Sequence, residues 1–278
     1  MPPIAHVEFL APYQRIIDGE VDPKAGSARL IDNPIGVGAV GGSGTRLIAQ
    51  VLTELGVAMA TPINRAGDAL EWPPFKAILN SEANRGRDRA TLIASASQAF
   101  ETFLDARRQE LGLTGRAGWK VPGTFHWLRD LNSYFPRMQY IHLMRNGLDM
   151  AYSGNQEQAA NWGPQMGLSI ERDSDGRITP ARMLEYWLTA NEQALEAASE
   201  CLGERCYLLR FEQLCTQPRQ QMQQLREFLQ LPASEETVDK VAAMVHPPKS
   251  VGRYRELPWQ TDFTDEQLRR LEALGYAA

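Results

Sequence analysis

The stretch that most constrains the fold is residues 35–57, IGVGAVGGSGTRLIAQVLTELGV. It begins with a short apolar run, continues with a glycine-rich segment and ends with apolar residues at helical spacing. These features predict a strand, a tight loop and a helix. Glycine lets the backbone approach an anion closely, and the first N–H groups of a helix favour negative charge. We therefore expect phosphate, or a similar group, to bind where this helix begins.

The predicted loop combines glycines with hydroxyl side chains: Gly41, Gly42, Ser43, Gly44 and Thr45. Gly36 and Gly41 have the G-x-x-x-x-G spacing of the nucleotide-binding P-loop, and Ser43 stands where that motif has Ser or Thr. Gly42 stands where the motif has lysine. Because the loop then supplies no cation to a transferring phosphoryl group, the sequence disfavours an ordinary ATPase or kinase.

Composition limits the classes of partner. The 278 residues carry a formal net charge of -5, which argues against general binding to nucleic acid or to an anionic membrane. The three cysteines have no CxxC spacing, so neither a disulfide framework nor a metal site is indicated. No stretch reaches the roughly 18 apolar residues of a membrane span. We expect a soluble protein of the reducing cytoplasm.

The rest of the chain alternates between strand-like and helix-like segments. Residues 1–34 are rich in proline and predict an irregular arm, followed by a single domain over 35–278. Further strands are predicted at 117–121, 138–144 and 206–209, and helices at 88–113, 125–135, 181–199, 219–229, 235–245 and 265–274. Segments 58–74 and 163–180 read as long loops, the second a possible lid. The pattern predicts an α/β domain of three layers with a central, mostly parallel sheet.

A second motif, YIHLMRNGLDMAYS at 140–153, places Arg145 at the end of a predicted strand and Ser153 eight residues later. An arginine fork and a hydroxyl at this spacing can hold one phosphate dianion. Taken singly, Arg145 could equally be an ion-pair residue and Ser153 a solvated position.

Together the two motifs resemble the sulfotransferases that use 3′-phosphoadenosine 5′-phosphosulfate (PAPS). That family has an SGT core in its phosphate loop and a strand-end arginine followed by serine at this spacing. WKVP at 119–122 is similar to its Lys-x-Pro strand end, and SVGRY at 250–254 is similar to the basic loop that closes over the nucleotide. The resemblance covers most of the chain after residue 34.

The resemblance implies a site for the co-substrate PAPS and no need for a metal. Its 5′-phosphosulfate would lie on Gly41, Gly42, Ser43, Gly44, Thr45 and Arg46, its 3′-phosphate on Arg145, Ser153 and Arg253, and its adenine near Tyr207 and Phe211. The resemblance also makes a homodimer plausible. The acceptor hydroxyl, or amine, cannot be identified from the sequence.

The main departure from the family is Gly42, where many members have a lysine or arginine. Lys120 and Arg46 are the candidates to supply that charge, and Lys120 is preferred. An attacking alcohol also needs a base. Asp68 and Glu71 rank first for that role, and His126 lies close to the position of a catalytic histidine in cytosolic members. His142 is expected to be a packing residue.

Two other functions stay open. The segment GGSGTRL alone resembles the signature of sugar-nucleotide pyrophosphorylases, so the chain could be a nucleotidyltransferase that binds a nucleoside triphosphate. Such an enzyme would need a divalent metal and a second lysine after the loop, whereas here a helix follows directly. The other alternative is a nucleotide-binding protein that has lost its catalytic activity.

Overall fold

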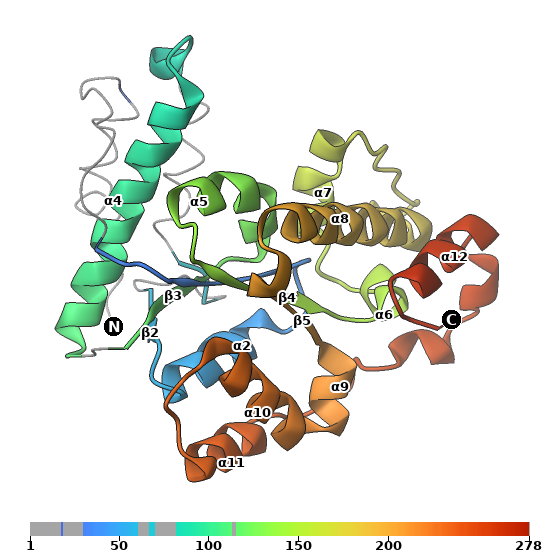
Figure 1. Cartoon of the computed structure of the whole chain (residues 1–278). Coiled ribbons are helices and arrows are strands. Elements are labelled where there is room, and N and C mark those ends of the chain that lie inside the picture. Colours follow the sequence, from blue (N-terminus) through green and yellow to red (C-terminus); the bar gives the residue numbers. More distant parts are fainter. Residues whose placement is uncertain (1–17, 19–29, 61–66, 70–81, 113–114, 278) are drawn as a thin grey trace.

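A parallel sheet forms the centre of the chain in the computed structural model, which describes residues 18, 30–60, 67–69, 82–112 and 115–277. Its five strands lie in the order β2-β3-β1-β4-β5 (Figure 1). They are β1 (Ile35–Ala39), β2 (Ala58–Met59), β3 (Ala117–Lys120), β4 (Gln139–Met144) and β5 (Cys206–Arg210). The order places β1, which leads into the phosphate loop, in the middle of the sheet.

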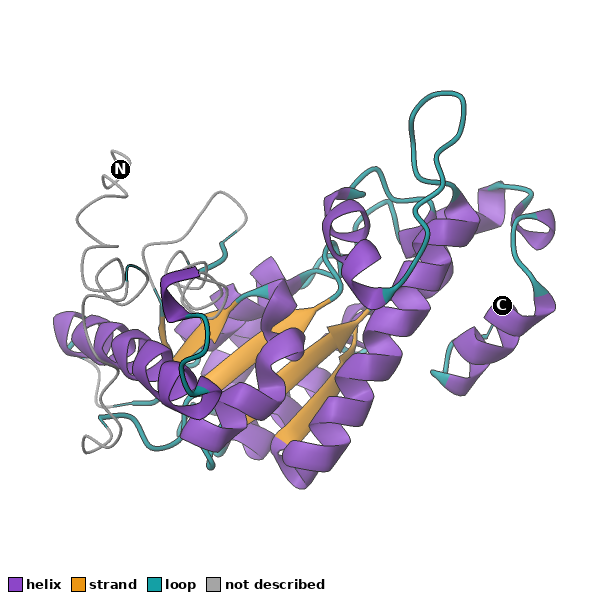
Figure 2. Ribbon diagram, turned by 90° about the horizontal axis from the view of Figure 1, so that it is seen from above, coloured by secondary structure: helices purple, strands orange, loops and turns teal. Residues whose placement is uncertain are grey.

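Helices cover both faces of the sheet, as the two perpendicular views show (Figures 1 and 2). One face packs on α2 (Thr45–Glu54), α10 (Pro218–Leu229) and α11 (Glu235–Ala243). The other packs on α4 (Arg89–Glu110), α5 (Leu128–Tyr134) and α8 (Pro180–Cys201). The other α-helices among the described residues are α6 (Gly147–Ala151), α7 (Glu157–Trp162), α9 (Phe211–Thr216) and α12 (Asp265–Ala273). This three-layer arrangement confirms the predicted fold class.

The strands divide their side chains between two apolar cores. Ile141 and Leu143 of β4 belong to the core beneath α2, whereas Tyr140 and Met144 belong to the core beneath α8. This alternation is what a strand buried on both faces requires. On β1, Gly38 lies against the core beneath α8. A Cβ atom at Gly38 would lie 2.4 Å from the Tyr140 hydroxyl.

The structure confirms the strands predicted at 117–121, 138–144 and 206–209. The helices predicted at 88–113, 181–199, 219–229, 235–245 and 265–274 are likewise present, with ends that differ by at most three residues. The expectations for 1–34 stay predictions, because only residues 18 and 30–34 of that arm are described.

Two segment predictions need correction. Residues 58–74 are not a loop throughout, because Ala58 and Met59 pair with β3 as the edge strand β2. Residues 125–135 are not one α-helix: Pro122 starts a 3₁₀ segment, Pro122–Trp127, that gives way to α5. The predicted loop at 163–180 is irregular apart from a short 3₁₀ turn, Pro164–Met166, and one antiparallel bridge between Arg172 and Ile178.

No helix was predicted over α7 and α9, and none was delimited over α6; the three helices have only five or six residues each. A helix of this length has less than two turns, so no apolar periodicity can build up. All three lie at the carboxyl end of the sheet, beside the phosphate loop and Arg145. Among the described helices, none is long and apolar enough to cross a membrane.

Candidate active site

The phosphate loop connects the end of β1 to the start of α2 in the middle of the sheet. Gly42 and Gly44 have φ angles of 93° and 98°, in the left-handed region that glycine enters without strain. In the described chain no side chain caps α2 at Gly44, and its first turn has no acidic residue. Its first N–H groups therefore suit an anionic ligand. The Ser43 hydroxyl instead donates to the carbonyl of Val40, at 2.6 Å, and so closes the loop.

A cavity of about 530 Å³ opens at this loop. Five predicted site residues of the phosphate loop line it, and so do the predicted catalytic residues Asp68 and Lys120. The loop residues are Gly41, Gly42, Gly44, Thr45 and Arg46. Phe211 and His246 lie at other parts of its wall. The fold thus brings together residues that are up to two hundred positions apart in sequence.

Lys120 and Asp68 pair with each other in the cavity wall. The Lys120 ammonium, at the end of β3, donates a hydrogen bond to the Asp68 carboxylate. Only 2% of the Lys120 side chain is exposed, against 24% for Asp68. Burial lowers the pKa of Lys120 and the Asp68 carboxylate opposes that shift, while the nearby Arg46 lowers the pKa further. The predicted cation and the predicted base are therefore neighbours.

Arg46 reaches the same place from α2. A Cβ atom built on Gly67 would lie 3.6 Å from Cγ of Arg46 and 3.9 Å from Nζ of Lys120. Both predicted cations thus flank the glycine that precedes Asp68. An anion on the phosphate loop would meet positive charge from this side.

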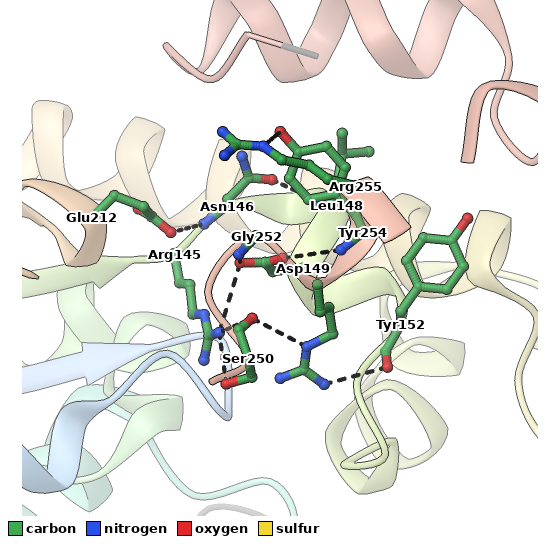
Figure 3. Close-up of polar contacts among 11 residues, drawn as sticks. Arg145, Asn146, Leu148, Asp149, Tyr152, Glu212, Ser250, Gly252, Tyr254 and Arg255 are labelled. Atoms are coloured by element: carbon green, nitrogen blue, oxygen red, sulfur yellow. Dashed lines mark hydrogen bonds and ion pairs between the residues drawn. The ribbon is translucent and has the colours of Figure 1, made fainter. Parts of the chain in front are cut away.

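A second group of polar side chains lies around Arg145, which is 5% exposed (Figure 3). Its Nη2 atom donates to the carbonyl and the hydroxyl of Ser250, at 2.5 and 2.9 Å. Arg253 donates from Nε to the same carbonyl, at 3.2 Å. The two guanidinium groups thus converge on one acceptor. Burial lowers the pKa of Arg253, and the charge of Arg145 lowers it further.

Asp149 holds this group in place. Its carboxylate accepts from the N–H of Gly252 at 2.8 Å and lies 3.7 Å from Nη2 of Arg145 (Figure 3). One carboxylate thus faces two arginines, while the Nε atom of Arg145 is buried without a hydrogen-bond partner in the described structure. A buried donor without a partner is costly, so the arrangement suits a further anionic ligand.

The ring of Phe211 lies between the phosphate loop and the polar group around Arg145. The Arg145 guanidinium lies 5.2 Å from the centroid of the ring, and a Cβ atom on Gly44 would lie 2.6 Å from its Cε2 atom. Phe211 therefore separates the phosphate loop from Arg145 by the width of one aromatic ring. Ser153 is nearly buried after α6, where its Oγ atom accepts from the N–H of Asn155 at 3.2 Å.

Other predicted residues lie away from the cavity. Tyr207 packs against Phe228 of α10, with 5.1 Å between ring centroids, and its hydroxyl donates to Gln224. His126 is exposed and packs against the ring of Trp162. Neither residue lines the cavity. Glu71 lies outside the described residues.

His142 is a packing residue, in agreement with the sequence prediction. It is fully buried between the Tyr140 hydroxyl and the Asn191 amide, each at 2.9 Å. The Asn191 Nδ2 atom donates to the carbonyl of Trp187, so its Oδ1 atom accepts from His142. Burial lowers the pKa of His142 to about 4.

Sequence reasoning missed the residues that α7 contributes. Asn155, just before α7, lines the cavity together with Glu157 and Gln158 of α7, and the Gln158 amide oxygen accepts from the N–H of Gly41 at 2.5 Å. His246 also lines the cavity, from the segment after α11. These residues follow no motif, and only the folded chain brings them to the loop.

Known proteins of one family match this chain over most of its length. The model of the sulfotransferase family matches residues 34–235. A protein of Aquifex aeolicus (strain VF5), named only as uncharacterized, is 25% identical over 169 residues, which are 61% of this chain. The aligned part is 19% of that longer relative.

Solved structures of similar fold include two sulfotransferase domains. The domain from the olefin synthase of Synechococcus PCC 7002 has a TM-score of 0.56 and 14% identity, with 92% of this chain and 98% of that chain covered. The domain from the curacin biosynthetic pathway has a TM-score of 0.54 and 19% identity, with 90% and 99% covered. A sulfotransferase of Mycobacterium avium has a TM-score of 0.53 and 11% identity, with 98% and 82% covered.

Proposed function

Because the chain belongs to the sulfotransferase family, we propose that it transfers a sulfuryl group from PAPS to an acceptor hydroxyl, or to an amine. The observation that carries this proposal is the pairing of two anion sites across Phe211. The phosphate loop lies on one side of the ring and the Arg145–Arg253 pair on the other. PAPS has two anionic groups, on its 5′ and 3′ positions, and so requires two such sites.

In this proposal the phosphate loop binds the 5′-phosphosulfate. The N–H groups at the start of α2 and the Thr45 hydroxyl would donate to its oxygens. Arg145 and Arg253 would bind the 3′-phosphate by displacing the Ser250 carbonyl that both now contact. Phe211 would support the nucleoside between them.

The reaction is an in-line displacement at sulfur. The acceptor oxygen forms a bond to sulfur as the bond between sulfur and the bridging phosphate oxygen breaks. 3′-Phosphoadenosine 5′-phosphate (PAP) then leaves with the electron pair of that bond. Lys120 stabilises the negative charge that develops on the departing phosphate, because its ammonium is buried beside the loop.

Asp68 is the proposed base for the acceptor proton. It lines the cavity and is the more exposed partner of its ion pair, so a substrate can reach it. Its contact with Lys120 couples proton removal to charge stabilisation on the leaving group. Glu71 and His126 keep their place as alternative bases, and Arg46 as an alternative cation.

A transfer assay with sulfur-labelled PAPS tests this proposal. The protein is incubated with labelled PAPS and a panel of alcohols, sugars, phenols and amines, and both labelled product and PAP are measured. We expect at least one acceptor to gain label in equal amount to the PAP released. Turnover of a nucleoside triphosphate that depends on magnesium, without any use of PAPS, would instead support the nucleotidyltransferase alternative.

We further propose a cytoplasmic location and a homodimer. Cys201, Cys206 and Cys215 are free thiols, as a reducing compartment allows. Size-exclusion chromatography with light scattering tests the dimer, and a mass of about one chain would contradict it.

A further inference from the structure

Gln158 of α7 is in direct contact with the phosphate loop. Its Oε1 atom accepts from the N–H of Gly41 at 2.5 Å. A Cβ atom built on Gly41 would lie 2.4 Å from Cδ of Gln158 and 2.6 Å from its Nε2 atom. The amide group thus lies directly against the glycine that precedes Gly42.

The side chain is held from a fixed helix. Gln156, just before α7, bonds through its amide to both the N–H and the carbonyl of Ile178, each at 2.9 Å. Ala159, which follows Gln158, is buried. These contacts fix the start of α7 against the protein, so Gln158 reaches the loop with little freedom to move away.

The orientation of the amide leaves one donor group for a ligand. The Oε1 atom accepts from the N–H of Gly41. The other polar atom of the amide is the donor Nε2, which has no hydrogen-bond partner among the described residues. Gln158 lines the cavity at the loop. An anion bound there would therefore find an amide N–H₂ group beside the loop.

Gly42 itself cannot easily carry a cation. Its φ angle is 93°, and a Cβ atom there would lie 3.0 Å from Cε of Met150, which is buried. A lysine at this position would strain the backbone and press on Met150. At the loop, Gly42 has no side chain, and the Gln158 side chain from α7 contacts the preceding glycine.

We propose that Gln158 is a binding residue for the anion on the phosphate loop. Its Oε1 atom holds Gly41, and its Nε2 atom donates to an oxygen of the 5′-phosphate or the sulfuryl group. A neutral donor from α7 thus stands beside the loop position that has no cation. This inference rests on the proposed function for the identity of the ligand, and on the loop geometry alone for the role of Gln158.

Titration calorimetry with PAP tests this role in three variants. Gln158→Met keeps the length of the side chain and removes both amide atoms. Gln158→Glu keeps the shape and places a negative charge beside the anion. Gln165→Met is the matched control, since Gln165 is an exposed glutamine near the same helix that donates to the carbonyl of Asn161. We expect PAP affinity to fall about tenfold in Gln158→Met and further in Gln158→Glu, with no change in the control.

A second ligand separates binding from a merely structural role. Adenosine 3′-phosphate lacks the 5′-phosphate, so the Gln158 variants should bind it as the wild type does. Unchanged PAP binding in Gln158→Met would overturn the inference, because the amide would then contribute nothing to the ligand. Tighter binding would overturn it too, because Gln158 would then be blocking the loop. Equal losses for both ligands would overturn it as well, since the damage would not be local to the 5′ site.

Failure of the proposed function would look different. In that case the wild-type protein itself would not bind PAP. The same variants are then titrated with inorganic pyrophosphate, which needs only the phosphate loop. Weaker pyrophosphate binding in Gln158→Met supports the role of Gln158, and unchanged binding overturns it.

Discussion

Lys120 and Asp68 form an ion pair in the wall of the cavity, with the ammonium almost fully buried and the carboxylate partly exposed. The two residues come from β3 and from the segment after β2, which are neighbours in the sheet. Pairing with Asp68 opposes the fall in the pKa of Lys120 that burial causes. The pair therefore places a lysine in the wall of the cavity that Gly42 also lines.

Replacing Lys120 tests that cation. Lys120→Met should lower kcat for sulfuryl transfer by about a hundredfold, because the substitution removes the preorganised positive charge that stabilises the departing phosphate. Affinity for PAP should change less. Lys240→Met is the control, since Lys240 forms an exposed ion pair with Glu54 and neither residue lines the cavity. An equal effect of the two substitutions on kcat would contradict the role of Lys120.

The pH dependence of transfer tests the pair as a unit. In Asp68→Asn the carboxylate that raises the pKa of Lys120 is absent, so that pKa falls further. Lys120 then loses its proton at lower pH, and the alkaline limb of the kcat profile should move to lower pH. If Asp68 is also the base, kcat at the optimum drops by about a hundredfold or more. An unmoved alkaline limb would show that Asp68 does not control Lys120.

The loop glycines allow a matched test of close packing. Gly44 and Gly56 have similar φ angles, 98° and 88°, so alanine strains the backbone alike at both. Only at Gly44 would the new Cβ atom press on Phe211, whereas nothing lies within 4 Å at Gly56. Gly44→Ala should destabilise the fold by about 1–3 kcal/mol more than Gly56→Ala in urea unfolding, and it should weaken PAP binding. Equal stability of the two variants would argue against the contact.

Because His142 is buried with a lowered pKa, we predict that the folded chain loses stability in mild acid. Its pKa in the folded chain is about 4, below the ordinary value of 6.5, so the unfolded chain binds the proton more tightly. The contribution of neutral His142 to the free energy of unfolding is complete above pH 6.5. It is lost as the pH falls through 4, and the total loss is about 3 kcal/mol. Urea unfolding from pH 8 to pH 4 should show a smaller loss in His142→Gln than in the wild type. Identical losses would contradict a buried neutral histidine.

The sheet and its long helices could be predicted because their patterns are strong and local. The run before Gly41 and the periodic stretch of α8 each carry enough buried residues to identify the element. The two-residue strand β2 could not be predicted, because it is defined only by its pairing with β3. Short helices such as α7 escaped for the same reason of length.

The site was predictable where a motif fixed it. Arg145 and Arg253 belong to separate motifs, and the structure brings them to one carbonyl. Tyr207 was placed near adenine by resemblance; its ring packs against Phe228 and does not line the cavity, and its place near adenine stays a prediction. Gln158 could not be foreseen, because its role depends on how α7 packs against the loop.

The 3′-phosphate tests the central claim most directly. Calorimetric titration of the wild type and Arg145→Ala with PAP and with adenosine 5′-phosphate isolates that group. Because arginine forks bind phosphate strongly, we expect the wild type to prefer PAP by about a hundredfold and Arg145→Ala to bind both nucleotides nearly alike. Arg129→Ala, at an exposed ion pair with Glu200, should keep the wild-type preference. A wild type that binds the two nucleotides equally, or a preference that survives in Arg145→Ala, would contradict a PAPS site on this chain.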